Sequence, residues 1–451
     1  MTIQPERIIV CGAGLAGCLL AVELAQAGHV VVVLEKRSDP RVAGAVGGRS
    51  INLAISARGL AALQRAGLKE TLLMQAVPMP GRQIHVDDHS FFQPYSRTPN
   101  RAINSMSRGG LNAALIVAAD AFDTVTIHFD SAIEDIDLEK TCVTTVNGEV
   151  FDGALIVGAD GAFSVVRQKL QTMPRFNFSQ SYLPHGYKEL FIPATESGPH
   201  QPFQLEPNAL HVWPHGSSMM IALPNFNGSF TCTLFWPFEG EHSFEAVTPT
   251  NVRAFFESNY PDAARIMPTL EEDFAKNPTS TLATMRCCPW SRGNVVLIGD
   301  AAHAIVPFYG QGANAAFEDC SVLVDCLAAH PGNTRAAIEA YETARIDNAN
   351  AIADMAIANF LDMRDHSGSA VHRWQKKGSQ FLGTLAPGLW TPLYDMISFT
   401  LIPYAAAQAK AMRQARVLCW IAVVFLVAIG VLLWRYLALP HRRRMTRRSV
   451  R

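Results

Sequence analysis

The chain has 451 residues, of which 49% are hydrophobic, so it can form two domains with a large core, and global disorder is excluded. The net charge is −1, but six arginines lie in the last twelve residues, which leaves the rest mildly acidic and gives no electrostatic case for nucleic-acid binding. The nine cysteines show no repeated spacing, which suits a reducing compartment and predicts no disulfide framework or metal site.

The first predicted element is an apolar strand over residues 7–11, which leads into a G-x-G-x-x-G turn and a helix-forming segment. A second apolar run over residues 30–34 ends at Glu35. This order is typical of a dinucleotide-binding unit, in which free N–H groups at the helix start bind a pyrophosphate and the acid binds a ribose. A purely structural turn is the alternative. The residues expected at the dinucleotide are Gly12, Gly14, Leu15, Ala16, Gly17 and Glu35.

Two further glycine turns follow apolar runs later in the chain. One contains Asp160, and the other contains Asp300, whose carboxylate can accept hydrogen bonds from the ribityl hydroxyls of a flavin. The helix start after Asp300, at Gln311 and Gly312, can direct N–H groups at the flavin O2. An ordinary turn and a helix-capping aspartate are the alternatives. Three such turns favour a flavin-dependent hydroxylase over an NAD dehydrogenase, and the lack of a second G-x-G-x-x-G motif favours a nicotinamide cofactor that binds transiently.

The middle of the chain changes character, because residues from about 180 to 285 carry aromatic and β-branched runs typical of an antiparallel sheet. Alanine-rich helical periodicity follows over residues 312–363. We therefore expect a discontinuous nucleotide-binding domain interrupted by a sheet domain for the substrate. The predicted boundaries are 1–178 and 291–345 for the FAD-binding domain, 179–290 for the sheet domain, 346–415 for a helical region, 417–439 for a membrane anchor and 440–451 for a basic tail.

The anchor is predicted from residues 417–434, which contain no charged side chain. Eighteen residues at about 1.5 Å each approach the roughly 30 Å hydrocarbon core of a bilayer, and the apolar character continues to Leu439. Trp420 and Trp434 lie near the two ends, as interfacial aromatic residues do. A buried core helix is the alternative. Arginines flank both ends, so the charge pattern does not fix the orientation.

Longer segments resemble the class A FAD-dependent aromatic hydroxylases, and most narrowly the members that act on L-kynurenine. The resemblance spans residues 5–410 and is carried by residues 48–54, 81–86, 93–95, 185–190, 208–216 and 305–312. It implies an α/β fold: a Rossmann-like FAD-binding domain with an inserted antiparallel-sheet substrate domain, a helical C-terminal region and a C-terminal transmembrane helix. It also extends the expected cofactor site to Arg108, Ala313 and Asn314.

The resemblance implies a substrate site as well. Arg82 and Tyr95 would hold the carboxylate of L-kynurenine, and Asn359 and Tyr404 would complete the polar contacts. The expected apolar wall consists of Leu210, Met219, Ile221, Leu223 and Phe235, which residue type alone would assign to core packing. Two positions depart from the family pattern: Ala313 stands where methionine is usual, and Asp362 stands where glutamate is common.

The implied reaction uses NADPH to reduce FAD, whose C4a-hydroperoxide, formed with O2, hydroxylates L-kynurenine to 3-hydroxy-L-kynurenine in tryptophan catabolism and NAD biosynthesis. The aniline nitrogen activates the ring, so no strong protein base is required. The resemblance implies the mitochondrial outer membrane in a eukaryote, and otherwise an inner membrane with a cytosolic catalytic domain. Three alternatives stay open: a hydroxylase of another carboxylate-bearing aromatic, a membrane flavoprotein that acts on lipids, and a flavin-binding scaffold without activity.

Overall fold

A computed structural model describes residues 6–42, 52–86, 89–364 and 390–445. Its N-terminal part is built on a six-stranded sheet in the order β18-β19-β12-β1-β2-β8, in which all neighbours except β18 and β19 are parallel. The strands are β1 Arg7–Cys11, β2 Val30–Leu34, β8 Val125–His128, β12 Leu155–Gly158, β18 Ser291–Arg292 and β19 Val295–Leu297. Because parallel strands share one carboxyl edge, the three predicted glycine turns, which follow β1, β12 and β19, lie along the same edge.

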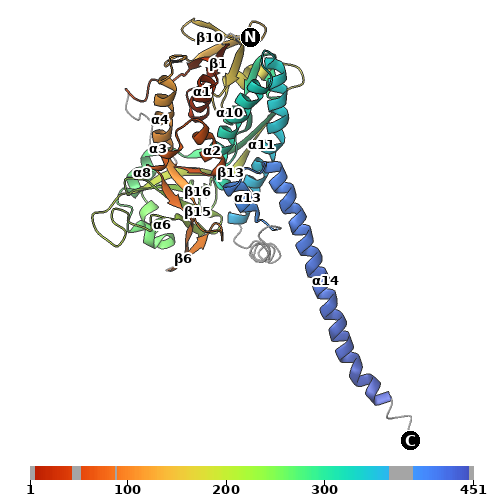
Figure 1. Ribbon diagram of the computed structural model, residues 1–451. Coiled ribbons are helices and arrows are strands. Elements are labelled where there is room, and N and C mark those ends of the chain that lie inside the picture. The colour runs from red at the N-terminus through yellow and green to blue at the C-terminus, as the bar shows by residue number, and fades with distance from the viewer. Residues whose placement is uncertain (1–5, 43–51, 87–88, 365–389, 446–451) are drawn as a thin grey trace.

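Helices pack around this sheet and meet one another. Helix α1 (Leu15–Gln26) packs against α4 (Arg108–Asp120) and α10 (Gly312–Ala329), and α10 also contacts α2 (Ala57–Arg65) and α11 (Thr334–Arg364) (Figure 1). The three apolar strands β1, β2 and β12 supply much of the core, because both faces of a parallel sheet are covered. Shorter helices are α3 Lys69–Leu73, α5 Val165–Gln171, α9 Asp300–His303 and the 3-10 helix η1 Pro307–Tyr309.

The second large sheet has seven strands in the order β17-β13-β16-β15-β14-β5-β6. Their bounds are β5 Gly81–Val86, β6 His89–Pro94, β13 Asn177–Ile192, β14 Leu210–His215, β15 Ser218–Pro224, β16 Phe230–Pro237 and β17 Ser280–Cys288. The predicted range 179–290 leaves out β5 and β6, and the sheet is not wholly antiparallel, because β5 pairs with β14 in parallel. Local alternation cannot reveal a pairing between strands so far apart in the sequence. Helices α6 Val252–Asn259, α7 Pro261–Ala264 and α8 Leu270–Lys276 contribute to the core on one side of this sheet.

Two small sheets complete the strands of the described chain. One has the order β11-β10-β9 and the other β3-β7-β4. Their bounds are β3 Asn52–Ile55, β4 Val77–Met79, β7 Ile103–Ser107, β9 Ile133–Asp137, β10 Cys142–Thr145 and β11 Val150–Asp152.

The C-terminal part ends in two helices, α13 (Leu393–Phe399) and α14 (Tyr404–Met445). Helix α14 projects from the body as a single rod (Figure 1), and its segment Tyr404–Arg435 is long and apolar enough to cross a membrane. Only 6% of its most apolar window is buried, so this window is not part of the core of the described residues. The helix includes the first part of the predicted basic tail, while residues 446–451 lie outside the described residues.

Candidate flavin and substrate site

The turn between β1 and α1 is shaped by its glycines. Gly12 has a φ of +105°, which side chains rarely adopt, and a Cβ atom there would lie 2.7 Å from the Ala159 carbonyl oxygen. A Cβ atom on Gly17 would lie 1.9 Å from the Gly12 carbonyl oxygen. In contrast, a Cβ atom on Gly14 would meet nothing within 4 Å. The turn is therefore packed tightly on its inner side and open at the helix start, where Leu15 and Ala16 are half-buried. This open start fits a pyrophosphate.

Glu35 lies directly after β2 and is tied to that turn. One carboxylate oxygen accepts a hydrogen bond from the Ala13 N–H at 2.9 Å, and the other accepts from the N–H and Nε of Arg37 at 3.0 and 2.8 Å. Burial would raise the pKa of Glu35, but these hydrogen bonds outweigh it and lower the pKa below its ordinary value. The carboxylate is therefore ionised and held beside the glycine turn, as a ribose acceptor requires.

Asp160, in the second turn, lies beside the start of α5. Its Oδ2 accepts from the backbone N–H groups of Val165 at 2.6 Å and Val166 at 3.3 Å, while Ser164 is the N-cap of the helix. Its Oδ1 is buried and has no hydrogen-bond partner among the described residues. A buried oxygen without a partner is costly, so this atom fits a hydroxyl or amide supplied by a ligand.

The third turn places Asp300 opposite Arg108. Both side chains reach solvent, yet surrounding protein atoms raise the pKa of Asp300, and the nearby Arg108 guanidinium partly offsets the rise. Asp319 of α10, whose role was not predicted, stabilises the turn through hydrogen bonds to residues on either side of Asp300. Its Oδ2 accepts from the Gly299 N–H at 2.9 Å and lies 2.6 Å from Nε2 of His303, while its Oδ1 accepts from Nε of Arg345 at 2.7 Å. In the sequence, the only indication of this role of Asp319 is that an acidic residue stands within a largely apolar helix.

The start of α10 is fixed to the segment around α2 by the side chain of Asn314. Asn314 Oδ1 accepts from the N–H groups of Ser56 at 2.8 Å and Gly59 at 3.2 Å, and its Nδ2 donates to the carbonyls of Ala54 at 2.9 Å and Gly310 at 2.8 Å. This side chain is already saturated, so its predicted contact with the cofactor is limited to its backbone. The half-buried Gly312 and Ala313 leave the first turn of the helix accessible, as N–H donors to a flavin require.

On the substrate side, the structure brings Arg82 and Tyr95 together. The guanidinium carbon lies 5.4 Å from the Tyr95 ring centre and 5.7 Å from that of Tyr394. The two rings stack with centres 5.0 Å apart. The buried Nε of Arg82 has no partner among the described residues, so one donor is available to an anionic ligand. We call Arg82, Tyr95 and Tyr394 the carboxylate clamp.

Tyr404 does not lie with this clamp. Its side chain is fully buried, and its hydroxyl donates to Oε1 of Gln311 at 2.8 Å. The structure therefore does not bring Tyr404 together with Arg82 and Tyr95; Tyr394, ten residues earlier, lies beside both. Asn359 donates to the Phe308 carbonyl at 2.6 Å, and Phe308 packs on Phe235 with ring centres 4.9 Å apart, so Asn359 borders the apolar wall. Asp362 lies in α11, and its side chain lies outside the described residues.

The apolar wall follows from strand register. Arg82 pairs with Leu210, and Met219 pairs with Phe235, while Ile221 lies opposite Val212. Since side chains alternate along a strand, the sheet residues expected at the substrate share one face of the seven-stranded sheet. They are Arg82, Leu210, Met219, Ile221, Leu223 and Phe235. Four of the five apolar ones form one cluster with Phe308 and Phe360, and Leu223 lies outside it.

Comparisons with known proteins agree with this arrangement. Residues 6–356 match the FAD binding domain family. The chain is 47% identical to a kynurenine 3-monooxygenase of Salinispora tropica over 93% of both chains. It is 44% identical to one of Dictyostelium discoideum over 92% of both chains.

Solved structures show the same fold at lower identity. The tetrameric form of 2-methyl-3-hydroxypyridine-5-carboxylic acid oxygenase superposes with a TM-score of 0.68 at 21% identity, over 81% of this chain and 94% of the other. PqsL of P. aeruginosa in complex with 2-aminobenzoylacetate gives 0.65 at 21% identity, over 80% and 97%. The predicted fold class is confirmed, and the chain belongs to the kynurenine 3-monooxygenase family of FAD-binding proteins.

Proposed function

We propose that the protein hydroxylates L-kynurenine to 3-hydroxy-L-kynurenine, with FAD as cofactor and NADPH and O2 as co-substrates. The observation that carries this proposal is that Arg82, which belongs to the carboxylate clamp, lies on the same sheet face as the apolar wall. A molecule that suits both has a carboxylate at one end and an aromatic ring at the other. L-kynurenine has this form, and relatives at 47% and 44% identity are named for it.

Each predicted cofactor residue has a place in this proposal. The open start of α1, at Gly12, Gly14, Leu15, Ala16 and Gly17, would bind the pyrophosphate, and Glu35 would accept from the adenosine ribose. Asp300, with Arg108 beside it, would accept from the ribityl chain, and Asp160 would offer its unpaired oxygen. Backbone N–H groups from Gln311 to Asn314 would donate to the flavin ring. Bound FAD supplies the redox chemistry, namely hydride acceptance from NADPH and activation of O2.

The chain's own contribution is placement and exclusion of water. The guanidinium of Arg82 and the hydroxyls of Tyr95 and Tyr394 fix the amino-acid end of the substrate, which orients the ring along the apolar wall. The wall excludes water from the reacting atoms. The amine of the substrate already activates the neighbouring ring carbon, so the proposal requires no side chain to act as a strong base.

Product analysis tests the function. The full chain in detergent, supplied with FAD, NADPH and O2, should convert L-kynurenine to 3-hydroxy-L-kynurenine with matching oxygen uptake, and 4-hydroxybenzoate should give no product. Hydroxylation of 4-hydroxybenzoate in place of kynurenine would favour a different aromatic substrate, and NADPH oxidation that no aromatic compound stimulates would contradict the proposal.

We also propose that α14 anchors the protein in a membrane. Supporting this, residues such as Trp420, Leu426, Leu432 and Trp434 are each more than half exposed, and they would otherwise face water. After expression in cells, the protein should stay with the membrane fraction through alkaline carbonate extraction. Quantitative release into the supernatant would contradict insertion.

A further inference from the structure

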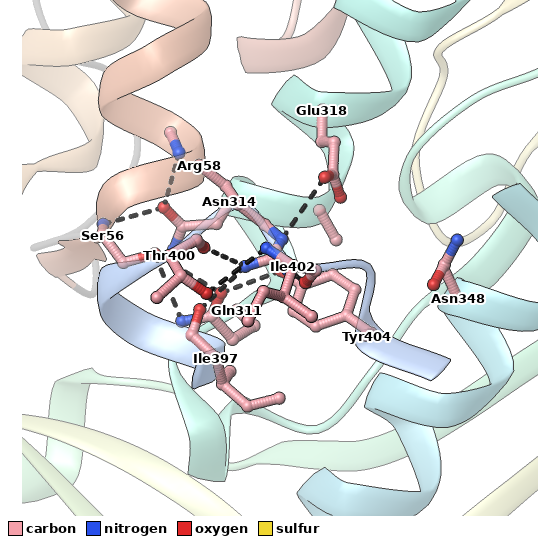
Figure 2. Close-up of polar contacts among 12 residues, drawn as sticks. Ser56, Arg58, Gln311, Asn314, Glu318, Asn348, Ile397, Thr400, Ile402 and Tyr404 are labelled. Carbon is pink, nitrogen blue, oxygen red and sulfur yellow. Dashed lines mark hydrogen bonds and ion pairs between the residues drawn. The ribbon is translucent and has the colours of Figure 1, made fainter. Parts of the chain in front are cut away.

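Arg58 of α2 is a buried arginine outside the flavin and substrate contacts described above. Its side chain has no exposed surface, and its guanidinium donates to the carbonyls of Ile397 at 2.9 Å and Thr400 at 2.8 Å and to that of Ile402. Figure 2 shows these bonds converging on the guanidinium between α2 and the segment that joins α13 to α14. A buried charge is tolerated only when such partners replace its hydration.

Two further contacts fix the orientation of this guanidinium. Its Nε lies 3.3 Å from Oε1 of Glu318 on α10, and its plane lies over the Tyr404 ring at 4.0 Å from the ring centre. Five donors in a rigid fork suit this task, because one arginine can bond several carbonyls while it stacks on an aromatic face. Arg58, on α2, therefore contacts α10 and the two C-terminal helices α13 and α14.

One of these connections leads to the substrate side. Ile397 and Thr400 lie at the C-terminal end of α13, where carbonyls without helical partners favour a cation. The same helix carries Tyr394 of the carboxylate clamp. Its Asp395 accepts from Ser96 Oγ and the Arg101 guanidinium, each at 2.9 Å, so α13 is tied at both ends.

The other connection leads to the flavin side. Tyr404, which Arg58 covers, donates its hydroxyl to Gln311 at 2.8 Å, and Gln311 directly precedes the first residue of α10. Gln311 is also within hydrogen-bond reach of Ser56, two residues before Arg58. These contacts surround the helix start that is expected to face the flavin ring (Figure 2).

We infer that Arg58 is a positioning residue, which fixes α13 and the first turn of α14 against the start of α10 and so holds Tyr394 and Gln311 at one separation. The inference rests on the proposed function. If this separation varies, the substrate ring moves relative to the flavin, and turnover becomes uncoupled. NADPH, a proton and O2 then yield NADP+ and hydrogen peroxide, and no oxygen atom reaches the substrate.

Three variants test this inference in the full chain. Arg58→Lys keeps the charge but loses the fork, Arg58→Met removes the charge, and Tyr404→Phe removes only the hydroxyl to Gln311. Arg65→Met is the matched control, because Arg65 lies on the same helix but pairs, among the described residues, with Asp325 at the surface and with Glu23 of α1, and not with α13 or α14. If Arg58→Met does not fold, the two milder variants decide the outcome.

The first measurement is hydrogen–deuterium exchange, which does not depend on activity. In Arg58→Lys, peptides covering residues 393–404 and 307–314 should both exchange at least about tenfold faster than in the unaltered chain, and Arg65→Met should change neither. The second is the ratio of hydrogen peroxide formed to NADPH consumed, which should rise severalfold in Arg58→Lys and Tyr404→Phe at saturating kynurenine. Unaltered exchange in both segments, or unaltered coupling in the folded Arg58 variants, would overturn the inference. A failure of the proposed function is distinguishable, because the unaltered chain itself would then form no product.

Discussion

The ring of Tyr394 stacks on that of Tyr95 with 5.0 Å between ring centres. Tyr95 directly follows β6, whereas Tyr394 lies about 300 residues later in α13. Burial raises the pKa of both hydroxyls, so they remain protonated and can donate to a carboxylate at neutral pH. The substrate side of the site is thus completed by the segment that leads into the long apolar helix. Catalytic body and C-terminal segment form one structural unit.

Arg82→Ala should mainly weaken substrate binding. The loss of a charge-assisted contact to the carboxylate should raise KM for L-kynurenine about 10- to 100-fold, with a smaller effect on kcat. In steady-state kinetics, the KM of the conservative variant Arg82→Lys should lie between those of the unaltered chain and Arg82→Ala, since lysine keeps the charge but not the planar fork of donors. An unchanged KM in Arg82→Ala would remove Arg82 from the carboxylate site.

Tyr394→Phe and Tyr404→Phe should separate the two tyrosines. Tyr394→Phe should raise KM for L-kynurenine about tenfold or more, the effect of one lost hydrogen bond to a charged group. Tyr404→Phe should leave KM nearly unchanged, because its hydroxyl bonds Gln311. The same kinetic assay distinguishes the two tyrosines. A raised KM in Tyr404→Phe with an unchanged KM in Tyr394→Phe would assign the substrate contact to Tyr404.

Asp300→Ala should reduce the affinity for FAD by about tenfold or more, since it removes the acceptor for the ribityl hydroxyls. Titration of the apoprotein, followed by quenching of flavin fluorescence, measures this change. Asp325→Ala is the control, because Asp325 forms a surface ion pair on α10. Equal FAD affinity in Asp300→Ala and the unaltered chain would contradict the assigned role.

Glu23→Gln should change the pH dependence of stability. Glu23 is buried on α1, where burial raises its pKa to about 7 against a hydrogen bond from Ser321 and the charge of Arg65, with Asp325 also nearby. Between about pH 4.5 and 7 the unfolded chain releases this proton while the folded chain retains it, so stability falls as pH rises through that window.

The neutral variant removes this effect. Its free energy of unfolding should exceed that of the unaltered chain by about 1–3 kcal/mol at pH 8 and match it near pH 5. Thermal unfolding in detergent at the two pH values provides the comparison. A variant that is less stable than the unaltered chain at pH 8 would show that the carboxylate itself is stabilising.

The features of this molecule that could be predicted are those determined by residues close together in the sequence. The run from β1 through the glycine turn to Glu35 follows from local pattern, because a tight turn, a helix start and a buried acid act within one strand–helix–strand unit. The placement of β5 beside β14 depends on a distant pairing, and no local periodicity encodes it. The choice between Tyr394 and Tyr404 was equally hidden, because both lie in apolar C-terminal segments and the direction of α13 is set by contacts such as those of Arg58 and Asp395. The role of Asp319 was hidden because its partners Gly299, His303 and Arg345 come from other elements.

The proposed reaction requires that this chain hold FAD and admit L-kynurenine beside it. Anaerobic reduction of the purified, FAD-loaded protein by NADPH, followed by the loss of flavin absorbance, tests both parts at once. We expect flavin bands in the purified protein and bleaching that L-kynurenine accelerates at least about tenfold, with a weaker response in Arg82→Ala. Absence of bound flavin, or the same bleaching rate with and without L-kynurenine, would contradict it.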